Sequence, residues 1–173
     1  NIFTNTKDLK KKFSELKKIK IVYLSNLLRG KGFDILLNAY FELDEKVKKR
    51  FDIEFAGDFE DESLKTWFLK KIKNTKIKYH GVVAGKEKVK LLNNSHIFCL
   101  PTYYPYGEGQ PISILEAYAS GCLVLTTAHG GIPDVFKDDV NGFLLEKRSI
   151  SSIKRILISI YNNDNGLFDI AKN

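Results

Sequence analysis

The chain alternates short apolar runs with longer segments whose apolar residues recur every three or four positions. We expect the short runs to be strands, at Ile19–Ser25, Asp52–Ala56, Ile77–His80, Ile97–Leu100, Leu123–Thr127 and Asn141–Leu145. The longer segments predict helices at Gly32–Leu43 (continuing toward Arg50), Glu62–Lys73, Lys86–Asn94 and Pro111–Ser120, with a last helix through Ile153, Leu157 and Ile160. Apolar strands separated by helices are typical of parallel βαβ units that are buried on both faces. The pattern predicts a doubly wound, mainly parallel α/β domain of three layers with right-handed crossovers.

A lysine-rich segment precedes the first expected strand. Leu9, Phe13 and Leu16 recur there at helical spacing, so residues 1–18 are expected to form a basic amphipathic helix, or interdomain segment, before a domain at 19–173. The length of 173 residues suits one domain with its own core. Because the chain starts at Asn1 and contains no Met, we expect it to be a piece of a longer protein.

The charge balance narrows the class of partner. With 28 Lys and Arg against 21 Asp and Glu, the formal charge of +7 favours nucleic acid, phosphorylated ligands or an acidic membrane surface. Cys99 and Cys122 adjoin apolar runs without metal-ligand spacing, so we expect buried free thiols in a reducing cytoplasm. No apolar run approaches the roughly 18 residues that a membrane span requires.

Glycine follows every one of the first five expected strands. In doubly wound sheets, ligands bind in the crevice beyond the carboxyl ends of the strands, where glycine lets the backbone approach a ligand. The five loops are 26–32, 57–60, 81–85, 101–110 and 128–132. We therefore expect a ligand site along this edge of the sheet.

The loop 101–110 leads into a helix that opens with Pro111, whose free first-turn amides form an anion site. Glu108 precedes this helix, and Glu116 lies inside it. A rise of about 1.5 Å per residue puts Glu116 roughly 8 Å beyond Pro111, which fits two separate subsites better than one acid/base pair. Each carboxylate suits the vicinal hydroxyls of a ribose or a hexose. The alternatives are a Glu116 paired with a nearby lysine and a Glu108 that complements the helix dipole.

These two glutamates also belong to a sequence motif. The segment from Glu108 to Gly121, with the strand that follows it, resembles the signature of family 4 glycosyltransferases. Five further motifs match that family in order, at Leu24–Gly32, Ala56–Asp58, His80–Val83, Gly130–Asp134 and Asn141–Leu144. The resemblance implies the C-terminal, donor-binding half of a GT-B enzyme, in which two Rossmann-like domains face a cleft.

The resemblance also implies roles for single residues. Glu116 would bind the ribose hydroxyls of a nucleotide sugar, and Glu108 would bind the hexose hydroxyls. The backbone of the intervening segment would hold the sugar and the diphosphate through its free amides, at Gly109, Gln110, Pro111 and Ile112, of which only Pro111 has no N–H.

The base and the diphosphate have counterparts in earlier motifs. Val82 and Val83 would border the base, and Lys31 matches a lysine that contacts the diphosphate. Asn26 stands where the family has a partner arginine, and Arg29, three residues later, is a candidate substitute.

The reaction implied is a retaining transfer of a hexose from a nucleotide diphosphate sugar, with a UDP-sugar favoured, to a sugar or lipid-linked acceptor. No D-x-D motif and no ligand-spaced His, Cys and Asp cluster occurs, so we expect no metal, and Lys31, Arg29 and the helix at Pro111 would stabilise the leaving diphosphate. We expect a cytoplasmic protein, peripheral at the inner face of the membrane, in capsule or lipopolysaccharide assembly. Without its N-terminal domain, the isolated chain is expected to bind donor weakly and to catalyse nothing.

Other functions remain as alternatives. A non-catalytic nucleotide- or phosphate-binding module on the same fold would follow if Asn26 marks a degenerate site. A nucleic-acid binder rests on charge alone, because no recognition helix or RNA-binding motif is present. A sugar-nucleotide epimerase fits the order of the motifs less well.

Overall fold

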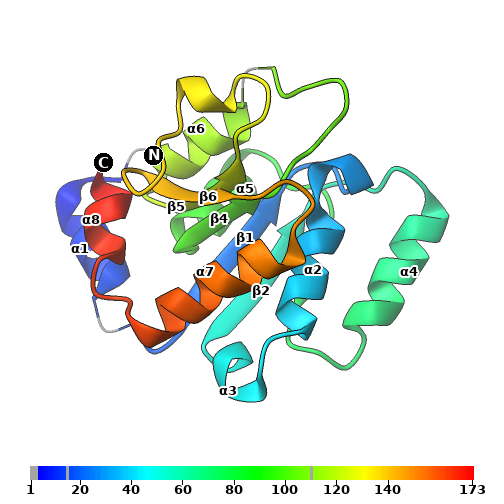
Figure 1. The fold of residues 1–173 in the computed structure, drawn as a ribbon, viewed down its shortest axis with the longest axis horizontal. Coiled ribbons are helices and arrows are strands. Elements are labelled where there is room, and N and C mark those ends of the chain that lie inside the picture. The colour runs from blue at the N-terminus through cyan, green and yellow to red at the C-terminus, as the bar shows by residue number, and fades with distance from the viewer. Residues whose placement is uncertain (1–3, 15, 110) are drawn as a thin grey trace.

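Six parallel strands form one sheet in the computed structural model, which describes residues 4–14, 16–109 and 111–173 (Figure 1). The order across the sheet is β3-β2-β1-β4-β5-β6, and every neighbouring pair is parallel. The strands are β1 (Ile19–Leu24), β2 (Phe51–Ala56), β3 (Lys78–Tyr79), β4 (Ile97–Leu100), β5 (Leu123–Thr127) and β6 (Gly142–Leu145). The predicted doubly wound parallel class is confirmed.

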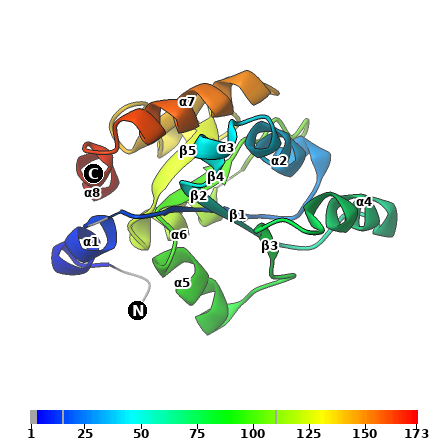
Figure 2. The same cartoon turned by 90° about the horizontal axis from the view of Figure 1, so that it is seen from below.

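Helices cover both faces of this sheet (Figure 2). They are α1 (Thr6–Phe13), α2 (Phe33–Phe41), α3 (Glu45–Lys48), α4 (Glu62–Ile72), α5 (Gly85–Asn93), α6 (Ile112–Ala119), α7 (Ile150–Asn162) and α8 (Leu167–Lys172). One face carries α2, α3 and α7, and the other carries α5 and α6. Of the helices in the described part of the chain, none has both the length and the apolar character needed to cross a bilayer.

The helix expected to run from Gly32 toward Arg50 is interrupted. It ends at Phe41, and Asp44 is extended (φ −62°, ψ 149°) before the short α3 begins. The break lets both Leu43 and Val47 turn into the core ahead of β2. Helix α8 was not predicted, because its six residues are too few for a helical period to stand out.

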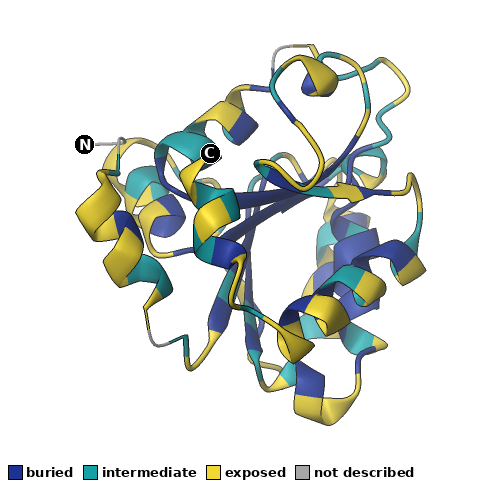
Figure 3. Cartoon of the chain, turned by 60° about the vertical axis from the view of Figure 1, so that its left-hand side comes forward, coloured by how far each residue is buried: buried dark blue, intermediate teal, exposed yellow. Residues whose placement is uncertain are grey.

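The strands are the most buried part of the molecule (Figure 3). An aromatic cluster joins two of them to two helices: Tyr23 of β1, Phe55 of β2, Phe33 of α2 and Phe68 of α4, all fully buried. The rings of Phe55 and Phe68 meet edge to face, with 5.1 Å between their centroids, an arrangement that aromatic pairs prefer. The cluster fixes α2 and α4 against the sheet near the end of β1.

The basic helix α1 packs onto the domain. Leu9 is buried, and the Lys12 ammonium donates to the carbonyl oxygen of Ser120 at 2.8 Å, satisfying an end of α6 that has no partner within the helix. It also contacts the sulfur of Cys122 at 3.5 Å, and burial lowers the pKa of Lys12. Both cysteines are buried and free, as predicted. The division of the chain at residue 18 stays a prediction.

His96 ties the same helix to the sheet in a pH-sensitive way. Its Nδ1 accepts from the Lys20 amide at 2.9 Å and its Nε2 donates to the Lys12 carbonyl at 3.1 Å, so both ring nitrogens are used in the neutral form. Burial, with a contribution from the Lys12 charge, lowers the pKa of His96 from 6.5 to about 4.

We therefore expect acid to destabilise the fold through His96. Between pH 6.5 and about pH 4 the unfolded state binds more protons than the folded state, so stability falls as the pH drops through this window, by at most about 3 kcal/mol. Urea unfolding of the wild type and of His96→Gln at several pH values measures this loss. A variant with the same pH dependence as the wild type would contradict the assignment to His96.

The strand order places the crevice. The connection from β1 to β2 runs over one face of the sheet, whereas the connection from β4 to β5 runs over the other face. Neighbouring strands whose connections diverge in this way leave a crevice at their carboxyl ends, where doubly wound domains bind ligands. The predicted loops 26–32 and 101–110 lie at this point.

Candidate functional site

The loops that follow β1 and β4 are joined along their backbones. The Tyr103 amide donates to the carbonyl oxygen of Gly30 at 2.7 Å. Gly32 adopts φ +75°, and a Cβ there would lie 2.3 Å from the carbonyl oxygen of Pro101, so a larger residue cannot occupy this position without movement. This close approach sets Lys31 beside the segment that carries Glu108.

Lys31 and Glu108 form a largely buried ion pair in the crevice. The Lys31 ammonium lies 2.6 Å and 2.7 Å from the two carboxylate oxygens, and the two side chains are only 16% and 10% exposed. The hydroxyl of the buried Thr102 donates to Oε1 of Glu108 at 2.5 Å. The ammonium also lies 4.7 Å from the centroid of the Tyr104 ring, a cation–π distance. Two residues predicted separately from sequence are thus brought into direct contact.

The loop after β5 holds Glu108 from the other side. The Gly131 amide donates to the carbonyl oxygen of Glu108 at 2.7 Å. At Gly130, where φ is +58°, a Cβ would lie 2.2 Å from the same oxygen. His129 Nε2 donates to the carbonyl oxygen of Tyr104 at 2.6 Å, so this histidine is engaged with the loop backbone. The backbone on both sides of Glu108 is therefore fixed by neighbouring loops.

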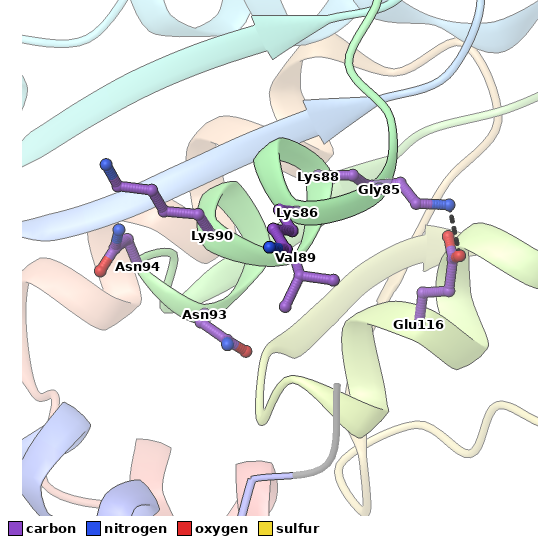
Figure 4. A pocket seen from close by; sticks show the side chains of 8 residues that line it. All are labelled: Gly85, Lys86, Lys88, Val89, Lys90, Asn93, Asn94 and Glu116. Atoms are coloured by element: carbon purple, nitrogen blue, oxygen red, sulfur yellow. Dashed lines mark hydrogen bonds and ion pairs between the residues drawn. The ribbon is translucent and has the colours of Figure 1, made fainter. Parts of the chain in front are cut away.

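Glu116 lies apart from this pair, on α6. Its Oε1 is 2.5 Å from the ammonium of Lys88, which reaches across from α5 (Figure 4). Glu116 lines an open cavity of about 650 Å³ between these helices, whereas Glu108 lines a different cavity of about 380 Å³. The two carboxylates thus line separate cavities, and their assignment to two subsites of one ligand stays a prediction. The lysine pairing considered as an alternative for Glu116 is present.

The segment between the two glutamates differs slightly from expectation. Pro111 has ψ 69° and caps the helix, so α6 begins at Ile112 rather than at the proline. Gly109 is exposed, and the side chain of Ile112 is 62% exposed although it is apolar. Gln110 lies outside the described residues. The first amides of α6 have no acceptor within the helix and remain suited to an anion.

The loop after β3 presents apolar side chains near the start of α5. Val82 is 69% exposed, whereas Val83 packs partly against the core. An exposed valine beside a half-buried one offers an apolar surface of the kind a nucleobase covers.

Asn26 and Arg29 stand at the rim of the crevice. Asn26 is exposed, and its carbonyl oxygen accepts from the Tyr23 hydroxyl at 2.9 Å. The Arg29 guanidinium lies 3.4 Å from a carboxylate oxygen of Asp34 and 5.7 Å from the centre of the Trp67 ring. Arg29 is thus engaged by α2 and α4, and its part in diphosphate binding stays a prediction.

Sequence reasoning did not find Thr102 or Lys88. The sequence gives a weak indication of Thr102, because it is a polar residue that comes two positions after a fully apolar strand. It gives none of Lys88, since this is one of several lysines on a helix that reads as solvated. Within the described ranges, no three His, Cys, Asp or Glu side chains lie close enough together to hold a metal ion.

Known sequences resemble the chain over most of its length. The family model described as glycosyl transferases group 1 matches residues 4–173. An uncharacterised glycosyltransferase of Methanocaldococcus jannaschii is 28% identical over 159 residues, which cover 92% of this chain and 40% of that protein. The amylovoran biosynthesis glycosyltransferase AmsK of Erwinia amylovora is 26% identical over 146 residues, covering 82% and 36%. The chain spans about two fifths of the length of these relatives.

Solved structures show the same fold. HepE of Anabaena, crystallised with UDP-glucose, superposes with a TM-score of 0.79 at 20% identity, over 99% of this chain and 48% of HepE. The isolated C-terminal domain of LpcC, a glycosyl transferase group 1 protein of Francisella tularensis, superposes with a TM-score of 0.76 at 22% identity, over 98% of this chain and 93% of that domain. The chain belongs to the glycosyl transferase group 1 family and has the fold of the C-terminal domain of a GT-B glycosyltransferase.

Proposed function

We propose that this chain is the donor-binding half of a retaining, metal-independent glycosyltransferase that transfers a hexose from a UDP-sugar to a sugar or lipid-linked acceptor. The observation that carries the proposal is the Lys31–Glu108 ion pair in the crevice, close to the first turn of α6. A cation and a carboxylate held beside free helix amides offer partners for the phosphates and for the hydroxyls of one nucleotide sugar.

Lys31 and α6 would act on the leaving group. In the transfer, the bond between C1 of the hexose and the phosphate oxygen breaks, and the acceptor hydroxyl oxygen bonds to C1 on the same face. The hydroxyl proton passes to the departing diphosphate, on which negative charge accumulates. Lys31 and the first amides of α6 would stabilise that charge without a reorientation of solvent.

Donor binding would exchange the partners of the ion pair. Without donor, Lys31 and Glu108 neutralise each other and keep a buried charge from being unpaired. When the donor binds, its diphosphate accepts hydrogen bonds from the Lys31 ammonium, and the hexose hydroxyls donate to the Glu108 carboxylate. Thr102 holds Glu108 through this exchange because its hydroxyl bonds the carboxylate from the protein side.

The nucleoside would occupy the second subsite. Glu116 accepts from the ribose hydroxyls, and the apolar surface of Val82 and Val83 borders the base. The bound UDP-glucose of HepE, a protein of the same fold, supports a UDP-sugar here. The backbone at Gly109, Gln110, Pro111 and Ile112 would hold the sugar and diphosphate between the two subsites, with amides as donors at every position except Pro111, which has no N–H.

The acceptor and the setting complete the proposal. AmsK is named for amylovoran biosynthesis, which supports a role in cell-surface polysaccharide assembly. We propose that the protein is cytoplasmic and contacts the inner face of the membrane through exposed lysines of α1. The acceptor would bind an N-terminal domain of the same polypeptide, and residues 1–18 would lead from that domain into 19–173.

Binding of UDP-glucose to this chain, measured by calorimetry, tests the proposal. Glu116→Gln keeps the size of the side chain but removes its charge, so we expect affinity to fall about 10- to 100-fold, the cost of hydrogen bonds to a charged group. Glu62→Gln on α4, whose side chain is 84% exposed, is the matched control and should bind as the wild type does. Equal binding by the wild type and Glu116→Gln, or transfer catalysed by this chain alone, would refute the corresponding part of the proposal.

A second candidate is a non-catalytic nucleotide-binding module. It is favoured by Asn26 at the position of the family's arginine and by the engagement of Arg29 with Asp34 and Trp67. An assay of hexose transfer by the whole protein separates the two, because a module would bind UDP-glucose without turnover.

A further inference from the structure

The cavity between α5 and α6 is lined mainly by α5, and Glu116 closes its other side. Lys86, Lys88, Val89, Lys90 and Asn93 are among the side chains drawn there, and Lys88 is the one that reaches across to the carboxylate (Figure 4). The Lys88 and Glu116 side chains are 29% and 20% exposed, so water screens this pair less than it screens a surface ion pair.

The pairing constrains a side chain that would otherwise be free to rotate. A glutamate on a helix surface has several rotamers, and a contact from a second helix selects one of them. Lys88 takes Oε1, while a carboxylate has about four acceptor positions in all. The ammonium therefore orients Glu116 and leaves acceptor capacity for two hydroxyl groups.

The distribution of charge in the site also indicates a role for Lys88 beside Glu116. A diphosphate entering the crevice at Lys31 brings negative charge toward the second carboxylate of the site, and like charges disfavour binding. Lys31 pairs with Glu108 before the donor binds and with the diphosphate afterwards, so Lys88 provides a separate positive charge for Glu116 in both states. The negative charge of Glu116 is thus compensated when the diphosphate approaches.

We propose that Lys88 is a positioning residue that sets the orientation of Glu116 and thereby the preference of the site for ribose over deoxyribose. The inference rests on the proposed binding of a nucleotide sugar and deepens it. A correctly oriented carboxylate accepts from both hydroxyls of a ribose, whereas a 2′-deoxyribose leaves one acceptor position unused. Discrimination between the two sugars therefore depends on the Lys88–Glu116 contact.

Affinities for UDP and 2′-deoxy-UDP, measured by calorimetry on the same chain, test this role. We expect the wild type to prefer UDP by about tenfold. Lys88→Met should lower that ratio to about threefold or less, mainly by weakening UDP, and Lys88→Arg should restore most of it because the guanidinium also donates to a carboxylate. Lys70→Met is the control, because Lys70 is an exposed lysine of α4 and does not line this cavity. It should keep the wild-type ratio.

Equal weakening of UDP and 2′-deoxy-UDP by Lys88→Met would overturn the inference, because a merely structural or long-range electrostatic role affects both ligands alike. An unchanged ratio in Lys88→Met would overturn it too. Circular dichroism and a thermal melt identify a variant that fails to fold. If Lys88→Met fails to fold, the ratio of the UDP and 2′-deoxy-UDP affinities is measured on Lys88→Arg, and a loss of the wild-type ratio in that variant would contradict the inference. If the wild type binds no UDP, or if Glu116→Gln binds UDP as the wild type does, the proposed function itself fails. If Glu116→Gln weakens UDP binding as expected but Lys88→Met keeps the wild-type ratio, only the inference about Lys88 is refuted.

Discussion

Replacing Lys31 by methionine is expected to destabilise the domain by about 2–4 kcal/mol and to reduce UDP-glucose affinity by at least about tenfold. The loss of stability follows because Glu108, whose side chain is only 10% exposed, would be left as an unpaired charge in the crevice. The loss of affinity follows because the diphosphate would lose a charge-assisted hydrogen bond. Urea unfolding and calorimetry measure the two effects separately.

A double variant separates the two roles of Lys31. Removing the stranded charge with Glu108→Gln in the Lys31→Met background should recover at least half of the lost stability, because the buried charge is gone. It should not recover donor binding, since both polar partners of the donor are altered. Lys65→Met, at the exposed pair with Glu62 on α4, is the control and should change stability by less than about 0.5 kcal/mol. A Lys31→Met protein as stable as this control would contradict the structural part of the prediction.

Gly130→Ala is expected to displace the backbone that carries Glu108. The new Cβ would lie 2.2 Å from the carbonyl oxygen and 2.4 Å from the amide nitrogen of Glu108, so one of the two loops has to move. Left-handed strain at φ +58° adds to this overlap, and together they should cost about 3 kcal/mol. Because a displaced Glu108 no longer meets the hexose and Lys31, UDP-glucose affinity should fall about tenfold or more.

Gly107→Ala is the matched control for this prediction. Gly107 has φ +79° and adjoins Glu108, yet a Cβ there meets nothing within 4 Å. We expect the variant to be less stable by about 1–2 kcal/mol, because alanine is strained at this φ, and to keep donor affinity within about threefold of the wild type. Equal losses of affinity in the two variants would show that backbone strain, and not the contact between the loops, governs the site.

The local pattern of apolar residues predicted most helices and strands, but it did not predict which residues contact one another in the folded chain. Leu123–Thr127 was predicted to the residue, because a buried parallel strand is a continuous apolar run. The break at Asp44 was missed, because Leu43 and Val47 keep a helical spacing while the chain turns back toward β2. Capping at Pro111 was placed one residue off, since the dihedral angle at a helix end depends on the loop before it.

By itself, the sequence determined the class of fold, the edge of the sheet that carries the glycine loops, and the two glutamates that define the motif. These follow from period and spacing, which are local properties of the chain. Only the tertiary structure decided that Lys31 bonds Glu108, 77 positions away, and that Lys88 bonds Glu116. Such pairs depend on strand order and on how closely loops and helices approach, as at Gly32 and Gly130, and no local pattern encodes these quantities.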